Sequence, residues 1–301
     1  MKVLNLGSLN IDRVYSVEHF ARKGETIAST KLEINGGGKG LNQSVALARA
    51  GAEVYHAGAI GSDGTFLQTL FESAGVHTEY LQMSKAQTGH AVIQLTPEGQ
   101  NCIIISSGAN DEIQEEYIDE VLKHFSPGDF LLLQNETSNV AYAMRRAKEK
   151  GMRIVFNASP VDERMKTYPL ELVDYFLINE MEGCILADCE EISQSKYGEI
   201  IETVFLKFPH ACIVMTVGSD GVIYRDIHKK ASHDGYPVKV EDTTAAGDTF
   251  CGFFLAGVIQ GLSVEECLET ATRASAIAVS RKGAAVSIPD WKEVSRLLTT
   301  R

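Results

Sequence analysis

One stretch late in the chain combines a carboxylate with an expected helix start. In DTTAAGDTFCG (242–252), Asp248 stands just before FCGFFLAGVIQGL (250–262), which is apolar on nearly every side. The small residues of TTAAG can present successive backbone N–H groups at the helix N-terminus, where the helix dipole favours an anion. Beside an anion, Asp248 is either a helix cap or a base that takes a proton from an attacking hydroxyl.

A glycine-rich segment precedes a second expected helix. INGGGKGLNQSVALARAG (34–51) places Gly38, Lys39 and Asn42 at the helix entry, where unhindered backbone N–H groups can face a ligand. The segment is not a P-loop, because Gly40 follows Lys39 where Ser or Thr is required. The glycines alone would also fit a flexible turn, but Lys39 and Asn42 offer donors to a hydroxyl-rich ligand.

Asn10 and Asp12 lie two residues apart in GSLNID (7–12), at the end of the first expected strand. In extended backbone this spacing puts both side chains on one face. An amide beside a carboxylate can bind vicinal hydroxyl groups, since each hydroxyl both donates and accepts. An Asx-turn is the alternative interpretation.

Polar or glycine residues also follow three later strands, in LLLQNE (131–136), YFLINEME (175–182) and CIVMTVGSDGVIYR (212–225). Open α/β sheets bind ligands at the carboxyl ends of their strands, so these positions are candidate ligand contacts. Helix caps, first-turn acids and an ordinary hairpin are the alternatives. The residues concerned are Glu136, Asn179, Glu182, Thr216, Gly218 and Gly221.

The elements that must position these residues alternate between short apolar runs and helical patterns. This order predicts an α/β fold with a mainly parallel sheet built from βαβ units. Two excursions, at about 10–36 and 88–108, instead read as strands joined by turns and predict a small β-sheet inserted into a single domain over 1–301. The expected buried strands are KVLNLGS, EVYHAGAIG, DFLLLQNE, RIVFNAS, YFLINE and CIVMTVG.

Composition narrows the possible partners. The formal net charge of −12 offers no basic stripe for nucleic acid or an anionic membrane, so a small-molecule ligand is expected. The six cysteines form no C-x-x-C pair and mostly lie in apolar runs, which predicts reduced, buried thiols. The chain shows neither a signal-peptide pattern nor an uninterrupted apolar span, and we expect it in the cytoplasm.

Two of these segments together resemble the signatures of an enzyme family. GGGKGLNQSVALARAG (36–51) and DTTAAGDTFCG (242–252) are similar to the two motifs of the ribokinase-like, phosphofructokinase-B type sugar kinases, and the resemblance runs from NLGSLNID (5–12) to SRKGAAVSIP (280–289). It implies a three-layer α/β/α fold with a β-sheet lid, and ATP-dependent, Mg²⁺-assisted phosphorylation of the 5-hydroxyl of D-ribose. The alternatives are a kinase of another sugar or nucleoside (deoxyribose, fructose, a sugar phosphate), or a non-catalytic sugar- or nucleotide-binding sensor.

The resemblance also implies a role for each matched residue. Asp248 corresponds to the catalytic base, and the N–H groups of Ala245, Ala246 and Gly247 correspond to the anion hole for the transferring phosphoryl group. The sugar-binding positions are Asn10, Asp12, Gly38, Lys39, Asn42 and Glu136, with Asp248. The ATP-binding positions are Asn179, Glu182, Thr216, Gly218, Gly221, Gly247 and Thr272.

A potassium site and a dimer are implied as well. Oxygen-only ligands suit a hard alkali cation, and the matching positions are Asp242, Thr244, Ala278, Arg281, Gly283 and Ser287. The apolar strands HAVIQL and NCIIIS of the small sheet are expected to cover the sugar and to pair two subunits as a homodimer. Leu41 and Asn135 depart from the family pattern, which has Ala and an apolar residue there, and are expected to alter the sugar pocket.

Overall fold

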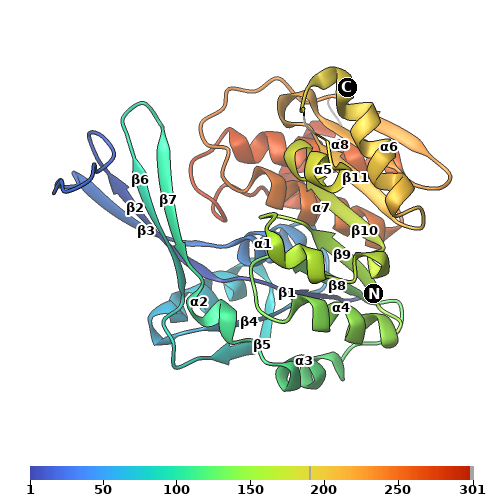
Figure 1. Ribbon diagram of the computed structural model, residues 1–301, viewed down its shortest axis with the longest axis horizontal. Helices are drawn as coiled ribbons and strands as arrows, with labels where there is room; N and C mark the ends of the chain where they lie inside the picture. Colours follow the sequence, from blue (N-terminus) through green and yellow to red (C-terminus); the bar gives the residue numbers. More distant parts are fainter. Residues whose placement is uncertain (190, 299–301) are drawn as a thin grey trace.

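A long, mostly parallel sheet runs through the centre of the molecule (Figure 1). The computed structural model describes residues 1–189 and 191–298, so positions 190 and 299–301 of the expected 1–301 domain lie outside the described residues. The strand order is β13-β12-β11-β10-β9-β8-β1-β4-β5, with antiparallel pairing at β11–β12 and β12–β13. The strands are β1 (Val3–Leu6), β4 (Val54–Ile60), β5 (His77–Met83), β8 (Phe130–Gln134), β9 (Arg153–Asn157), β10 (Tyr175–Asn179), β11 (Cys212–Thr216), β12 (Val222–Arg225) and β13 (Lys230–His233).

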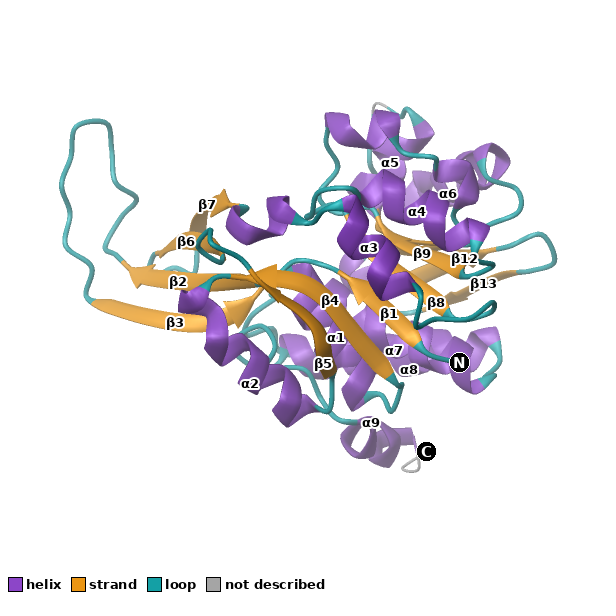
Figure 2. Ribbon diagram, turned by 90° about the horizontal axis from the view of Figure 1, so that it is seen from below, coloured by secondary structure: helices purple, strands orange, loops and turns teal. Residues whose placement is uncertain are grey.

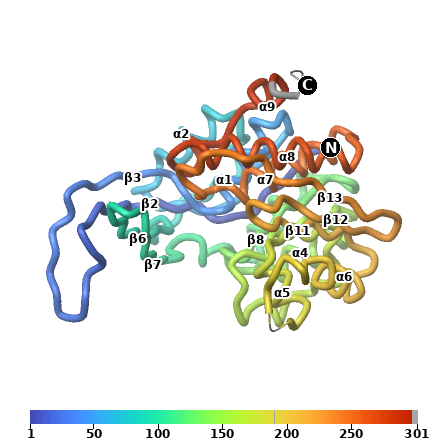
Figure 3. The backbone as a smooth tube through the Cα atoms, turned by 90° about the horizontal axis from the view of Figure 1, so that it is seen from above, coloured from blue at the N-terminus to red at the C-terminus, as the bar shows by residue number. Residues whose placement is uncertain are grey.

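Helices cover both faces of this sheet, as Figures 2 and 3 show from opposite sides. Alternate side chains of a strand enter the two apolar cores: Phe130 and Leu132 of β8 join one core, and Leu131 and Leu133 join the other. One face carries α1 (Lys39–Arg49), α2 (Thr65–Ala74), α7 (Ala246–Gln260), α8 (Val264–Val279) and α9 (Trp291–Leu298). The other carries α3 (Glu115–Leu122), α4 (Val140–Glu149), α5 (Glu180–Ala187) and α6 (Tyr197–Lys207).

A second, four-stranded sheet extends away from the main body (Figure 2). Its order is β3 (Lys31–Gly37), β2 (Asn10–Ser16), β6 (Gly89–Leu95) and β7 (Asn101–Ser106), with β2 parallel to β6 and the other two pairs antiparallel. β2 follows β1 after three residues, and β3 leads directly into α1. The small sheet therefore joins the main sheet at the point where the glycine-rich segment lies.

The predicted fold class is confirmed, and so are the six expected buried strands. The prediction of reduced, buried cysteines is wrong at two places: Cys184 and Cys189 are joined as a disulfide, and Cys102 is exposed on β7. Within residues 1–189 and 191–298, no helix has both the length and the apolar character needed to cross a membrane.

Candidate active site

Asp248 lies in the first turn of α7, at the edge of a cavity. The helix begins after Ala245, which adopts a left-handed conformation (φ 61°) that is unusual for a residue with a side chain. This turn places Ala245, Ala246 and Gly247 along the cavity wall, although the Ala246 amide also donates to the Thr243 carbonyl at 3.2 Å. The helix start thus presents backbone and a carboxylate to the same space.

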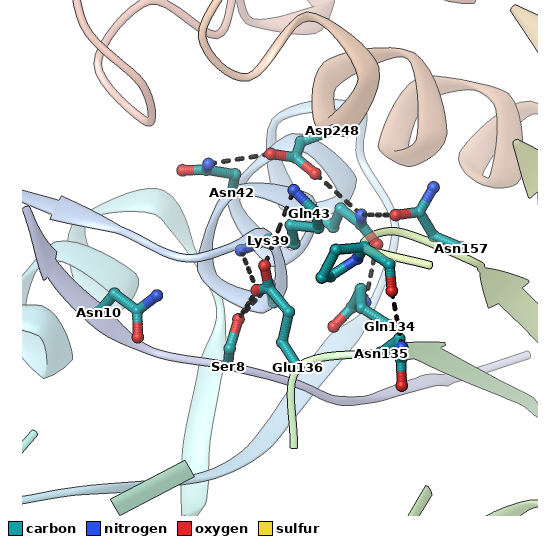
Figure 4. A network of polar contacts seen from close by, with 12 residues as sticks. Ser8, Asn10, Lys39, Asn42, Gln43, Gln134, Asn135, Glu136, Asn157 and Asp248 are labelled. Carbon is teal, nitrogen blue, oxygen red and sulfur yellow. Dashed lines mark hydrogen bonds and ion pairs between the residues drawn. The ribbon is translucent and has the colours of Figure 1, made fainter. Parts of the chain in front are cut away.

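Two amide side chains from α1 hold the Asp248 carboxylate (Figure 4). Nδ2 of Asn42 donates to Oδ2 at 2.9 Å, and Nε2 of Gln43 donates to Oδ1 at 2.9 Å. Burial raises the pKa of Asp248, while the positive charge of Lys39 and these two hydrogen bonds oppose the rise. Each carboxylate oxygen still has a lone pair for a further donor, such as a substrate hydroxyl.

Lys39 connects Asp248 to the residues expected to bind sugar. Its backbone N–H donates to Oε2 of Glu136 at 3.1 Å, and its Nζ lies 3.7 Å from Oε1 of Glu136. Ser8 donates its hydroxyl to the same carboxylate (Figure 4). The positive charge of Lys39 therefore lies between two acids, and the negative charges of Asp248 and Glu136 outweigh burial and raise the pKa of Lys39.

The start of β2 supplies the remaining sugar-side residues. Asn10 is buried, and its Oδ1 accepts a hydrogen bond from Nδ2 of Asn110 at 2.8 Å, which leaves the Asn10 NH₂ group free to face a ligand. Gly38 has a φ of 93°, and a Cβ there would lie 3.1 Å from the backbone of Ser8 and Asn10. Only glycine lets the glycine-rich segment pass this close to the end of β1.

The Asp12 carboxylate is expected to destabilise the folded protein when it is ionised. Burial, with the nearby charge of Glu136, raises the pKa of Asp12 to about 6. A raised carboxyl pKa means that ionisation destabilises the folded state: the cost is absent below pH 3.8 and complete above about pH 6. We expect Asp12→Asn to raise the free energy of unfolding by about 2 kcal/mol at pH 7.5 and by almost nothing at pH 4.

Thermal melts of the free protein across this pH range test the expectation. Asp63→Asn is the matched control, because Asp63 accepts hydrogen bonds from the Thr88 amide and hydroxyl, which lower its pKa despite burial. This control should destabilise the protein at pH 7.5. Equal effects of the two substitutions would contradict the account of Asp12.

A cavity of about 220 Å³ opens in front of α7. Its wall includes Asp248, Lys39 and the pair Asn179 and Glu182 at the start of α5. That pair forms a capping box: Glu182 N–H donates to Oδ1 of Asn179 at 2.8 Å, and Asn179 N–H donates to Oε2 of Glu182 at 3.0 Å. Burial raises the pKa of Glu182, because the ionised carboxylate is poorly solvated there, and a bound cation would stabilise that ionised form.

A larger and more apolar cavity, of about 630 Å³, adjoins the first. Thr216, Thr243, Ala246, Gly247 and Phe250 line both cavities, so the helix start of α7 separates them. The predicted nucleotide positions Thr216, Gly218, Gly221, Gly247 and Thr272 all lie in the wall of the larger cavity. Its size and composition suit a flat, apolar heterocycle with phosphates directed toward Asp248.

The expected potassium ligands come from two loops that the structure brings together. Oδ1 of Asp242 accepts from the Thr244 amide (2.9 Å) and hydroxyl (2.6 Å), and Oδ2 accepts from the Gly283 amide (2.9 Å). Burial alone would raise the pKa of Asp242, but these hydrogen bonds outweigh the effect of burial, and the pKa is lowered. The carboxylate is therefore ionised at neutral pH. An ionised carboxylate is an oxygen ligand of the kind that a hard cation prefers.

The other predicted positions of the potassium site differ in which oxygen atoms they could provide to a cation. The side chain of Arg281 turns to Glu293, with Nη2 at 2.5 Å from Oε1, so that only its backbone carbonyl is available to a cation. The Ser287 hydroxyl donates to the Ala284 carbonyl at 2.8 Å. Ala278 is buried at the end of α8, and its carbonyl accepts from the Arg281 amide at 3.0 Å.

The side chains of Leu41 and Asn135 face the interior of the protein. Leu41 is fully buried and belongs to the apolar core beneath α1. Asn135 points away from Glu136 (Figure 4): its Nδ2 donates to the Pro160 carbonyl at 2.6 Å, and its Oδ1 accepts from the Tyr168 hydroxyl at 2.7 Å. Both departures are accounted for by internal packing.

Several site residues escaped the sequence analysis because they are polar side chains inside otherwise apolar elements. Gln43 follows Asn42 in the glycine-rich motif, and Gln134 and Asn157 end the strands β8 and β9. Ser8 and Asn110 contact Glu136 and Asn10, respectively. The signal that could have identified these residues is a polar side chain within an otherwise apolar run of the sequence.

The site is divided along the chain. The sugar-side residues Asn10, Asp12, Gly38, Lys39, Asn42 and Glu136 all precede residue 137, and the nucleotide-side and potassium-side positions all follow residue 178. Asp248 is the sugar-side position that comes from the second part of the chain.

The chain is similar to known proteins over nearly its whole length. The family described as pfkB family carbohydrate kinase matches residues 1–291. The chain is 35% identical over 298 residues to a ribokinase of Haemophilus influenzae, covering 97% of each, and 31% identical to that of Bacillus subtilis, covering 98% of each. Ribokinase of Cryptococcus neoformans in complex with ADP has a TM-score of 0.86 at 32% identity, with 98% of each chain covered. Ribokinase of Arabidopsis thaliana complexed with ribose and ATP has the same TM-score at 28% identity, covering 99% of each.

Proposed function

The chain belongs to the pfkB family of carbohydrate kinases, and from this premise we propose that it transfers the γ-phosphoryl group of ATP to the 5-hydroxyl of D-ribose. The observation that carries the proposal is the position of Asp248, at the end of the sugar-side cluster and on the wall of the 220 Å³ cavity. The 31–35% identity to ribokinases over nearly the whole chain supports ribose as the acceptor.

The proposed mechanism is an in-line attack. Asp248 accepts the proton of the sugar hydroxyl as its oxygen approaches the γ-phosphorus. Asn10, Asp12, Asn42 and Glu136 hold the other hydroxyl groups, which fixes the attacking oxygen near the base. The amides of the Ala245–Gly247 turn and Lys39 stabilise the negative charge of the transferring group.

ATP and Mg²⁺ fit the two cavities. The apolar cavity of about 630 Å³ would hold the adenosine part, and the phosphates would extend into the smaller cavity, toward the start of α7. Glu182, with Asn179, would hold Mg²⁺ through water and phosphate oxygens, since no group of three or more His, Cys, Asp and Glu side chains within the described residues could hold a metal alone. Bound Mg²⁺ would neutralise phosphate charge.

Potassium is proposed to act through the Asp242 loop. Bound between Asp242, Thr244 and carbonyls of the 278–287 segment, it would fix the segment that leads into the anion hole. We expect replacement of K⁺ by tetramethylammonium at constant ionic strength to lower kcat about tenfold. Asp242→Ala should lower kcat in both buffers and abolish the increase in Tm that K⁺ gives the unmodified protein.

Glu241→Gln is the matched control for this prediction, because Glu241 is the exposed neighbour and pairs with Lys239 at 2.9 Å. It should keep the full response to K⁺. A protein whose turnover and Tm are both indifferent to K⁺ would contradict the potassium site without affecting the kinase proposal.

The substrate proposal is tested by ADP release with a panel of acceptors: ribose, deoxyribose, fructose, fructose 6-phosphate and adenosine. Ribose should give the highest kcat/KM. A preference for adenosine or for a phosphorylated sugar would replace ribose within the same family, and ligand binding without ADP release would favour a non-catalytic sensor.

We also propose that the small sheet covers the bound sugar and joins two copies of the chain. Leu32, Ile34, Ile103, Ile104 and Ile105 are each between 46% and 62% exposed on β3 and β7, and apolar strands of this kind are normally covered. Light scattering should give twice the mass of 32.8 kDa, and a monomer at micromolar concentration would overturn the dimer.

The proposed location of the protein is the cytoplasm.

A further inference from the structure

The buried amide of Gln43 is held in one orientation at Asp248. Its Nε2 donates to Oδ1 of Asp248 at 2.9 Å and lies 3.3 Å from Oδ1 of Asn157. Its Oε1 accepts from Nε2 of Gln134 at 2.7 Å (Figure 4). An amide rotated by 180° would direct its oxygen at two acceptor oxygens and its NH₂ group at a donor, so the observed orientation is the one that satisfies all three neighbours.

This orientation is set by backbone carbonyls, which can only accept. Nδ2 of Asn5 donates to the Gly40 carbonyl at 2.8 Å, so Oδ1 of Asn5 must be the atom that accepts from Nε2 of Gln134 at 3.0 Å. Gln134 must then donate to Gln43. On the other side, Nδ2 of Asn157 donates to the Leu177 carbonyl at 2.7 Å, which directs Oδ1 of Asn157 at Gln43.

The chain of amides is buried and costly to build. Asn5 and Gln43 are fully buried, and Gln134 is 1% exposed, with its own Oε1 unpaired in the described structure. Leucine or methionine would fill these positions without burying polar groups. A network that exists only for packing would have no reason to end on the carboxylate at the cavity.

We propose that Gln134 is a positioning residue that acts through Gln43 to hold Asp248 ready to accept the proton of the sugar hydroxyl. The proposal rests on the assignment of Asp248 as the base. Two donated hydrogen bonds, from Gln43 and from Asn42, stabilise the ionised carboxylate and orient its remaining lone pairs. The charged or titratable groups that face Asp248 are Lys39 on α1, Glu136 after β8, Glu182 on α5 by way of Lys39, and the buried thiol of Cys251 on α7.

Kinetic pH profiles of single and double variants test this proposal. Gln43→Met should lower kcat about 100-fold and Gln134→Met about tenfold, with the KM for ribose within threefold of the original. Because fewer hydrogen bonds stabilise the ionised form of Asp248, the acid limb of the kcat profile should move up by about one pH unit in each variant. In the double variant, Gln134→Met should add nothing to Gln43→Met, since its effect passes through Gln43.

Gln260→Met is the matched control. Gln260 lies on α7, donates to the Ala50 carbonyl at 3.0 Å and has no bond to Asp248, so its loss should affect Tm but not the acid limb. If Gln134→Met does not fold, the isosteric Gln134→Glu serves instead, because it retains at most one of the two donated bonds, and it should also lower kcat and raise the acid limb.

Two results would overturn the proposal: a folded Gln134 variant with the original kcat and acid limb, or multiplicative losses in the double variant. The base assignment is tested separately by Asp248→Asn. If Asp248→Asn is inactive while the Gln43 and Gln134 variants are unaffected, the positioning role of Gln134 is wrong but the base assignment stands. If Asp248→Asn is active, the base assignment itself is wrong.

Discussion

Asp248→Asn is expected to lower kcat by about 10³-fold with ribose and ATP, while the KM of each substrate changes by less than about fivefold. The substitution keeps the size of the side chain but removes its ability to accept a proton. It also replaces one acceptor oxygen by an NH₂ group that must face the donor of either Asn42 or Gln43. The loss therefore falls on the chemical step rather than on binding.

Coupled ADP-release kinetics at saturating substrates would measure this loss. Asp111→Asn is the control, because Asp111 is an exposed aspartate in a short helical turn outside both cavities. Isothermal titration of ribose onto the variant should still show binding. Turnover within a few-fold of the original would refute the base assignment.

Gly252→Ala is expected to destabilise the protein by about 3 kcal/mol and to lower kcat. A Cβ on Gly252 would lie 2.4 Å from Cβ of Ala46 and 2.8 Å from the backbone at Ala46 and Leu47. Since the obstacle is the α1 backbone, α1 and α7 must separate. Asn42 and Gln43 lie on α1, and Asp248 lies on α7, so a shift of one helix moves Asp248 relative to its two donors. A displacement of about 1 Å should lower kcat about 100-fold.

Gly198→Ala in α6 is the matched control, because no atom lies within 4 Å of its would-be Cβ. It should leave kcat unchanged and stabilise the protein by roughly 0.5–1 kcal/mol, since alanine has the higher helix propensity. Chemical denaturation of both variants decides the matter. A Gly252→Ala protein as stable as the original would show that the helix contact is more compliant than the backbone distances indicate.

The sequence predicts best those strands whose successive residues are all buried. Strands buried on both faces, such as β8 and β11, read as unbroken apolar runs bounded by polar residues. The hairpin β6–β7 is marked by its turn residues in TPEGQN (96–101). β5, with a half-buried and mostly polar sequence, gave no such signal.

The site is predicted less completely, because its contacts are made between distant segments. Asn42 and Gln43 are adjacent, yet both donate to one carboxylate more than 200 residues away. Gln134 and Asn135 are also adjacent, but they lie on opposite faces of the chain, so that Gln134 donates to Gln43 and Asn135 donates to the Pro160 carbonyl. The direction of a strand-end side chain follows from the tertiary fold and cannot be read from the residue type.

On the proposed assignment, the division of the site along the chain makes the two substrates separately exchangeable. The proposed acceptor positions other than Asp248 lie before position 137, and the proposed nucleotide positions lie after position 178. Recombination between relatives within 137–178 could therefore bring a new acceptor specificity to an unchanged phosphoryl donor. Such a hybrid must keep Asp248 in register, because Asp248 reaches across the junction to meet α1.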